Sequence, residues 1–172
     1  MAKVYLSTGS NQGDRLMLLV AAAQHINKTV GRVEQFSQVV ESEPWGFEAE
    51  TTFYNQVLEV QTGLSPHEVL AEVLNIEKNL GRKRTGKGYS SRTIDIDILF
   101  YDTDQINEPE LVIPHPELHK RRFVLLPLAE IAPGLVHPVF KVTVNELLER
   151  LHDESTVTAA IEKDEFARLF NH

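Results

Sequence analysis

Six segments between residues 3 and 101 show two kinds of hydrophobic periodicity, and their order constrains the fold more than any other feature of the chain. Strand-like segments alternate apolar and polar residues or carry short apolar runs, whereas helix-like segments repeat apolar residues every three to four positions. In chain order they are residues 3–8 (strand), 16–29 (helix), 32–42 (strand), 53–62 (strand), 66–81 (helix) and 93–101 (strand). The predicted order is therefore β-α-β-β-α-β.

This order is that of the split βαβ, or ferredoxin-like, arrangement of an α+β fold, in which an antiparallel sheet carries helices packed on it. Three later helix-like segments, at residues 122–131, 144–151 and 157–170, would be appended to it. The chain has 172 residues, close to the roughly 150 of an average domain, and no linker or repeat divides it. We expect one domain over residues 1–172, with residues 155–172 as a C-terminal helical extension.

Composition excludes several classes of function. The chain has no cysteine, which rules out disulfides, thiolate zinc sites, iron–sulfur clusters and cysteine nucleophiles. Its 17 Lys and Arg against 25 Asp and Glu give a formal net charge of −8, unlike that of a general nucleic-acid binder. No apolar run reaches the ~18 residues of a membrane span, and the first residues lack a signal-peptide pattern. We expect a cytoplasmic protein with no nucleic-acid or membrane partner.

Basic residues are concentrated in two short segments. Residues 82–92 hold five of the 17 basic residues, including Arg82, Arg84 and Arg92, and no acidic residue; Lys120-Arg121-Arg122 form a second run. Concentrated cations in an acidic protein indicate a local site for an anion. A solvated basic loop would give the same pattern, so either run alone leaves both interpretations open.

The segment Ile94-Asp95-Ile96-Asp97-Ile98 carries two acids on one face of a predicted strand and three isoleucines on the other. Two carboxylates ~6 Å apart repel by about 3 kcal/mol at an effective dielectric of ~20, so a pair inside a cleft needs a cation between its members. Oxygen ligands without thiolates suit Mg²⁺. Acids for Mg²⁺ beside arginines for phosphate are the components of phosphoryl transfer. The alternative is the solvated face of an amphipathic strand.

Three further residues suit recognition of a flat heterocycle. Asn55 offers a donor and an acceptor from a predicted strand, where asparagine is disfavoured. Phe53 shares its face, and Phe123 follows the second basic run. The alternatives are a satisfied polar group and ordinary core aromatics. His115 is rigidly held between two prolines, which suits a hydrogen bond to phosphate or nucleobase better than a helical zinc site with His119.

The stretch Arg92-Thr93-Ile94-Asp95-Ile96-Asp97-Ile98-Leu99 resembles the signature of the 6-hydroxymethyl-7,8-dihydropterin pyrophosphokinase family. Other motifs fall in the order and spacing of that family, and together they cover residues 3–151. They are Gly9-Ser10-Asn11, Pro44-Trp45-Gly46, Phe53-Tyr54-Asn55, Glu77 with Gly81-Arg82-Lys83-Arg84, Pro114-His115-Pro116, and Arg121-Arg122-Phe123-Val124-Leu125 with the prolines at 127 and 133.

The resemblance implies an enzyme that moves the β,γ-diphosphate of ATP to the hydroxymethyl oxygen of the reduced pterin and releases AMP. It implies two Mg²⁺ ions on Asp95 and Asp97, with Arg82 and Arg92 as the other catalytic residues, in a monomer that binds ATP and the pterin. The other implied site residues are, for the phosphates and nucleotide, Glu77, Arg84, Ile98, His115 and Arg121, and for the pterin, Ser42, Trp45, Gly46, Phe53, Asn55 and Phe123.

The chain departs from the family pattern at Tyr89, where tryptophan is common, and at Ser90-Ser91, where Gly-Pro is common. Two other classes of function compete with the enzyme. One is a ferredoxin-like regulatory domain that senses a nucleotide or metal without catalysis. The other is an RNA-recognition module on the same kind of sheet, which the negative net charge and the lack of its aromatic motif disfavour.

Overall fold

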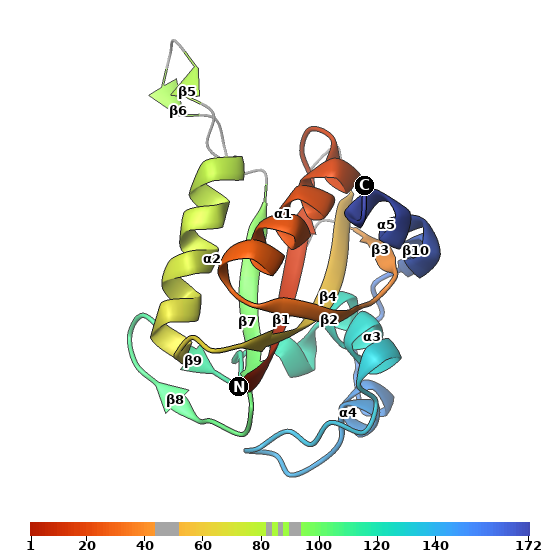
Figure 1. Cartoon of the computed structure of the whole chain (residues 1–172). Helices are drawn as coiled ribbons and strands as arrows, with labels where there is room; N and C mark the ends of the chain where they lie inside the picture. The colour runs from red at the N-terminus through yellow and green to blue at the C-terminus, as the bar shows by residue number, and fades with distance from the viewer. Residues whose placement is uncertain (44–51, 82–83, 86–87, 90–93) are drawn as a thin grey trace.

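The computed structural model describes residues 1–43, 52–81 and 94–172, with the backbone of residues 84–85 and 88–89. A six-stranded antiparallel sheet carries helices on both of its faces (Figure 1). The strands are β1 (Ala2–Ser10), β2 (Arg32–Phe36), β3 (Val39–Ser42), β4 (Phe53–Thr62), β5 (Arg84–Thr85), β6 (Gly88–Tyr89), β7 (Asp95–Tyr101), β8 (Ile106–Asn107), β9 (Val112–Ile113) and β10 (Val157–Ile161). The helices are α1 (Arg15–Thr29), α2 (Pro66–Gly81), the 3₁₀ helix η1 (Leu118–Lys120), α3 (Arg122–Ile131), α4 (Val144–Glu149) and α5 (Lys163–Phe170).

The main sheet has the strand order β10-β3-β4-β1-β7, and β2 pairs with β4 beside β3. Every one of these pairs is antiparallel, which confirms the predicted α+β fold with an antiparallel sheet. β5 with β6 and β8 with β9 form two small separate hairpins. β1 therefore lies in the interior of the sheet, with β4 on one side and β7 on the other.

The strand predicted at residues 32–42 is divided at Ser37 into β2 and β3. The Ser37 hydroxyl accepts a hydrogen bond from the Val57 N–H of β4 at 3.0 Å, and the Gln56 side-chain amide donates to the Ser37 carbonyl at 2.9 Å. Side chains therefore satisfy backbone groups where the ladder is interrupted. The break lets the register against β4 shift, from Phe36 opposite Leu58 to Val40 opposite Asn55.

Two hydrophobic cores occupy opposite faces of the sheet. On one face α1, α2 and α5 cover the strands, and Leu19, Val73 and Phe166 pack with Val4 and Ile96. On the other face α3 and α4 form the second core with Tyr5, Val57 and Leu99. No helix in the described part of the chain is both long and apolar enough to cross a membrane.

The start predicted for α2, with its capping box and its proline, is confirmed. The Glu68 N–H donates to the Ser65 hydroxyl at 3.2 Å, and the Ser65 N–H donates to the Glu68 carboxylate at 2.9 Å, as a capping box requires. Pro66 occupies the first helical position, where its missing N–H costs nothing. α2 then runs beside β7 and ends at the buried Gly81.

The prediction that residues 155–172 are helical throughout is wrong. Val157–Ile161 form β10, antiparallel to β3 at the sheet edge, and only Lys163–Phe170 form a helix. The β-branched side chains of this segment favour a strand, and the outer edge of β3 supplies unpaired backbone groups for it. Phe166 of α5 packs against Phe36 with ring centroids 5.0 Å apart, which fastens the segment to the main core.

We predict that Gly31→Ala destabilises the fold. Gly31 joins α1 to β2, and a Cβ atom there would overlap the backbone carbonyl oxygen of Gln61 in β4. The backbone must shift, so the free energy of unfolding in urea should fall by about 1–3 kcal/mol. Gly134→Ala is the matched control, because a Cβ at Gly134 meets no atom within 4 Å. Equal stability of the two variants would contradict this account of the turn.

Candidate active site

The two aspartates of β7 lie on an exposed part of the sheet. Asp95 and Asp97 are exposed, whereas Ile94, Ile96 and Ile98 are buried, so the predicted alternation is confirmed. Leu99, on the same face as the acids, is buried in the second core beneath α3. The face of β7 is therefore acidic at its start and apolar where α3 covers it.

The register of β1 brings residues from three strands into one row. Gly9 of β1 lies opposite Asn55 of β4 on one side and opposite Asp95 of β7 on the other. Ser7 lies opposite Asp97. Because neighbouring strands are ~4.8 Å apart, the row places the Asn55 and Asp95 backbones roughly 10 Å from each other on a common face. An amide and a carboxylate far apart in sequence thus flank one space.

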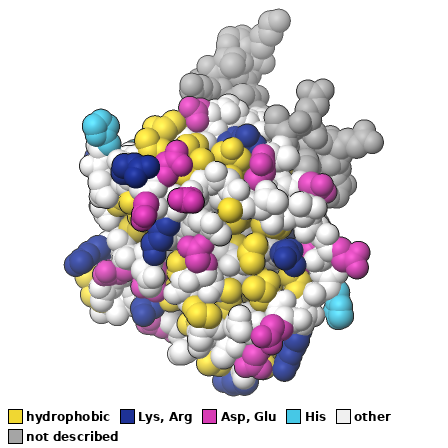
Figure 2. Space-filling model, turned by 90° about the vertical axis from the view of Figure 1, so that its right-hand side faces the viewer, with side chains coloured by type: hydrophobic (Ala, Val, Ile, Leu, Met, Phe, Trp, Pro, Cys, Tyr) yellow, Lys and Arg dark blue, Asp and Glu magenta, His cyan; other side chains and the backbone are white. Residues whose placement is uncertain are grey.

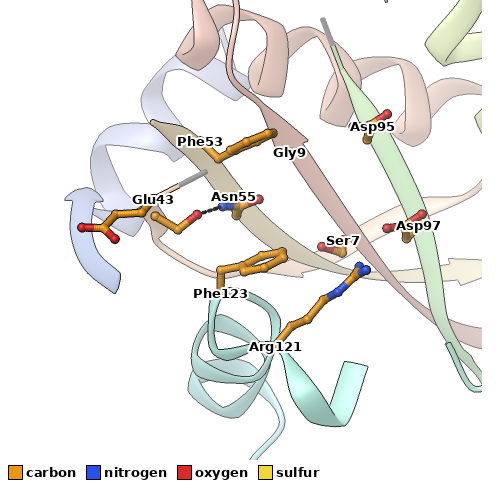
Figure 3. Close-up of a pocket in the computed structure, with 10 residues that line it drawn as sticks. Ser7, Gly9, Glu43, Phe53, Asn55, Asp95, Asp97, Arg121 and Phe123 are labelled. Carbon is orange, nitrogen blue, oxygen red and sulfur yellow. Dashed lines mark hydrogen bonds between the residues drawn. The ribbon is translucent and has the colours of Figure 1, made fainter. Parts of the chain in front are cut away.

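That space is a cavity of about 260 Å³ (Figure 3). Asn55 is buried at its floor, and its side-chain N–H donates to the buried Ser42 hydroxyl at 2.8 Å. This bond orients the amide and leaves its carbonyl oxygen and second N–H for a ligand edge. Residues that line the cavity are Ser7, Gly9, Ser42, Glu43, Phe53, Asn55, Asp95, Asp97, Arg121 and Phe123.

Two aromatic rings bound the same cavity. Phe53 at the start of β4 and Phe123 in the first turn of α3 lie on either side of the Asn55 amide (Figure 3). Both are half-buried, so each ring presents a face that a flat ligand could contact. Arg121 immediately precedes α3, and its guanidinium carbon is 5.8 Å from the centroid of the Phe123 ring. It extends into the cavity from the same side as Phe123.

A second cavity, of about 390 Å³, lies along β7 and shares Asp95 and Asp97 with the first. β7 is the last strand of the sheet, so one of its edges is available to this cavity. The predicted nucleotide residues Glu77, Ile98 and His115 line it. The remaining lining residues are Leu70, Leu74, Ile96, Pro109, Glu110, Leu111, Val112 and Pro116. The aspartate pair therefore stands at the boundary between two cavities.

His115 presents a neutral imidazole to the acids. Its Nδ1 accepts a hydrogen bond from the Glu117 N–H at 3.1 Å, which assigns the ring proton to Nε2. Nε2 is 3.8 Å from Asp97 Oδ2. Burial lowers the pKa of His115 more than the nearby Asp97 raises it, and Arg121 lowers it further. At neutral pH the ring is a fixed N–H donor directed toward the aspartate side of the cavity.

Glu77 is a buried acid that supports β7 from α2. Its Oε2 accepts a hydrogen bond from the Ile96 backbone N–H at 2.7 Å. Ile96 stands between the two aspartates in the chain, so this bond joins α2 to the strand segment that carries both acids. Glu77 is 7% exposed at the inner wall of the second cavity.

Comparisons with known proteins show the family to which this chain belongs. Residues 5–133 match the family model described as 7,8-dihydro-6-hydroxymethylpterin-pyrophosphokinase (HPPK). The chain belongs to this family. Two relatives are named 2-amino-4-hydroxy-6-hydroxymethyldihydropteridine pyrophosphokinase. The relative from Aquifex aeolicus is 42% identical over 146 residues, which are 85% of this chain and 90% of the relative. The relative from Porphyromonas gingivalis is 45% identical over 141 residues, 80% of this chain and 95% of the relative.

Solved structures share the fold. An HPPK-DHPS structure in complex with substrates superposes with a TM-score of 0.72 at 15% identity, over 86% of this chain and 43% of that chain. Wild-type HPPK-DHPS from Plasmodium falciparum gives a TM-score of 0.70 at 17% identity, over 87% of this chain and 44% of that chain. This chain thus spans less than half the length of each of these solved chains.

The structure brings most of the expected HPPK site residues together and adds others. Asp95, Asp97, Ser42, Phe53, Asn55, Arg121 and Phe123 line the first cavity, and Glu77, Ile98 and His115 line the second. Five further expected site residues lie outside the part of the chain that the structure describes. They are Arg82, Arg92, Trp45, Gly46 and the side chain of Arg84. Glu43 belongs to the Ser42–Gly46 loop, which the family resemblance places beside the pterin. Ser7 and Gly9 were not named as site residues from the sequence, because their place in the site depends on strand register and not on local pattern.

We predict that Glu77→Leu destabilises the protein more than Glu77→Gln. Leucine leaves the buried Ile96 N–H without its acceptor, which costs about 1–3 kcal/mol, whereas the glutamine carbonyl can still accept the hydrogen bond. The free energy of unfolding, measured in urea for both variants, tests this. Equal losses would show that the bond to β7 contributes little.

Proposed function

We propose that this chain transfers the β,γ-diphosphate of ATP to the hydroxymethyl group of 6-hydroxymethyl-7,8-dihydropterin in folate biosynthesis. The pterin hydroxyl oxygen attacks the β-phosphorus, the bond from that phosphorus to the oxygen of the α-phosphate breaks, AMP leaves, and the hydroxyl proton passes to solvent. The observation that carries the proposal is the aspartate pair at the boundary of two cavities. Family membership and the names of the relatives support it.

The first cavity suits the pterin. Asn55, held by Ser42, offers both an acceptor and a donor to the edge of the heterocycle. Phe53 and Phe123 offer ring faces to its two sides. In this arrangement the hydroxymethyl group extends toward β7, and so toward Asp95 and Asp97. Trp45 and Gly46 complete the pterin site in the proposal, by their resemblance to the family motif.

The aspartates suit Mg²⁺, because two exposed carboxylates on one strand face offer hard oxygen ligands between the two cavities. We propose that they hold two ions. Bound Mg²⁺ would supply positive charge that neutralises the phosphate oxygens. The chain's own contribution is to fix both carboxylates on a strand whose opposite face is buried, so that neither moves away from the reacting groups.

The nucleotide occupies the second cavity in this proposal. His115 donates from Nε2 to a phosphate oxygen, and Glu77 keeps β7 in place beside it. Arg121 approaches the transferring phosphates from the pterin side. Arg82, Arg84 and Arg92 are proposed to neutralise the remaining phosphate charge. No protein nucleophile is required, and catalysis consists of alignment and charge stabilisation.

We further propose a single-domain monomer over residues 1–172 that works in the cytoplasm without nucleic acid or membrane. On the side where β10 and α5 lie, basic and acidic side chains are interspersed, unlike a surface for nucleic acid (Figure 2). The order β3-β4-β1-β7 with α1 and α2 on one face supports the ferredoxin-like assignment.

We predict that Asp95→Ala and Asp97→Ala each lower AMP release by more than about 100-fold, because lost metal ligation costs several kcal/mol of transition-state stabilisation. Folding should survive, since both side chains point away from the buried isoleucines. AMP is measured with MgATP and the hydroxymethyl dihydropterin. Asp104→Ala, which changes an exposed acid beyond the end of β7, is the control.

Two outcomes would contradict this prediction. Unfolding of both the Asp95 and the Asp97 variant would favour a structural role for the acids. A wild-type chain that binds MgATP without AMP release would favour the regulatory domain that senses a nucleotide without catalysis.

We predict that Gly9→Ala weakens the pterin site. A Cβ at Gly9 would lie 2.8 Å from the Asn55 side-chain oxygen, so the amide must turn away. The KM for the pterin should rise about tenfold, a loss near 1.4 kcal/mol, with a smaller change in the KM for ATP. Gly63→Ala is the control, because its Cβ meets only the Met1 sulfur at 3.6 Å. An unchanged pterin KM would show that the Asn55 amide is not a pterin contact.

A further inference from the structure

Arg15, the first residue of α1, joins the ends of two strands on the face of the sheet opposite the candidate active site. Its guanidinium Nη1 donates to the Thr52 carbonyl at 2.9 Å and to the Thr52 hydroxyl at 2.7 Å. The same nitrogen is 3.6 Å from a Glu41 carboxylate oxygen. The guanidinium carbon lies 3.9 Å above the centre of the Tyr54 ring. Thr52 in turn donates its hydroxyl hydrogen to Glu41.

These partners alternate with residues of the first cavity. Glu41 precedes Ser42 at the end of β3, and Tyr54 stands between Phe53 and Asn55 at the start of β4. Glu41 and Tyr54 lie directly opposite each other in the ladder. Because side chains alternate along a strand, Arg15 contacts one face and the cavity residues point to the other. Arg15 can therefore act on the cavity only through the backbone that both sets share.

The chemistry of the contacts needs arginine. A guanidinium offers several N–H donors in one plane and can stack on an aromatic face at the same time. It thus contacts the end of β3 and the start of β4 together. Lysine would retain the charge near Glu41 but could not stack on Tyr54 while donating to Thr52 in the same geometry. The Arg15 side chain is 25% exposed, so water competes only partly for these contacts.

We propose that Arg15 is a positioning residue for the pterin half of the active site. The proposal rests on the proposed function. Arg15 holds the end of β3 and the start of β4 together, and these strand ends carry Ser42, Phe53 and Asn55 into the first cavity. Among the described residues, Arg15 contacts β3, Thr52 and β4, whereas the second cavity is built from α2, β7 and residues 109–116. Arg15 therefore sets the affinity for the pterin and leaves that for the nucleotide alone.

The test compares Arg15→Met, Arg15→Lys and the control Lys28→Met, which removes an exposed positive charge from the same helix. For each variant, KM and kcat are measured for both substrates. The dissociation constant of the pterin is measured calorimetrically with Mg²⁺ and a non-hydrolysable ATP analogue. Arg15→Met should raise the pterin KM and dissociation constant about five- to tenfold, with the ATP KM within about twofold of wild type. Arg15→Lys should recover part of the loss, and Lys28→Met should change neither constant.

A lower kcat with both KM values unchanged, or an equal rise in both, would overturn the proposal in favour of general loss of structure. Circular dichroism melting of each variant identifies that outcome. If the wild-type chain binds the pterin but releases no AMP, the proposed function fails, and the pterin dissociation constants still decide the role of Arg15. If the wild-type chain binds no pterin at all, both proposals fail.

Discussion

The register of β1 between β4 and β7 is the constraint on which the rest of the site depends. Side chains on a strand alternate between two faces, so a slip of one residue would exchange the two sets. In β7 such a slip would send Asp95 and Asp97 into the core that now holds Ile96 and Ile98. Burying two carboxylates in that core would cost so much free energy that the observed register is strongly favoured over the slipped ones. The same apolar packing that stabilises the sheet therefore also presents the acids to the cavity.

The two faces of the sheet are covered unequally, and this inequality creates the site. α1, α2 and α5 bury one face, whereas α3 and α4 bury the other face over Tyr5, Val57 and Leu99. Beyond α3 the described helices leave the second face uncovered, and its residues change from apolar to polar there: Ser7, Asn55, Asp95 and Asp97. α3 thus covers the second core and also forms a wall of the cavity, through Phe123 in its first turn and Arg121 just before it.

Local pattern predicted the elements whose periodicity is long and undisturbed. The bounds predicted for β4 and α3 agree with the structure, and the capping box at Ser65 fixed the start of α2. The sequence did not predict the break at Ser37, because the break depends on hydrogen bonds to Gln56 and Val57 of another strand. It did not predict β10 for a similar reason, since these five residues form a strand by pairing with the edge of β3.

The candidate site divides in the same way. The acids of β7, Asn55 and His115 could be named from the sequence, because their residue types are unusual for their predicted positions. Phe53 could be named because it shares a strand face with Asn55. Gly9, Ser7 and Arg15 could not. A glycine after a strand indicates a turn, and nothing local shows that a Cβ at Gly9 would meet Asn55, which is 46 positions away.

Arg15 and Gly9 illustrate two routes by which a sheet controls a binding site on one of its faces. Gly9 acts across the ladder on the same face, where the missing side chain gives the Asn55 amide its room. Arg15 acts from the opposite face, through strand ends whose alternate residues point into the cavity. In both proposals the ligand contact is made by a side chain on β4, and the position of that side chain depends on a residue of the β1–α1 segment. Because the two faces of a strand share one backbone, substitutions on the face covered by α1, α2 and α5 can alter a site of this kind without touching the ligand.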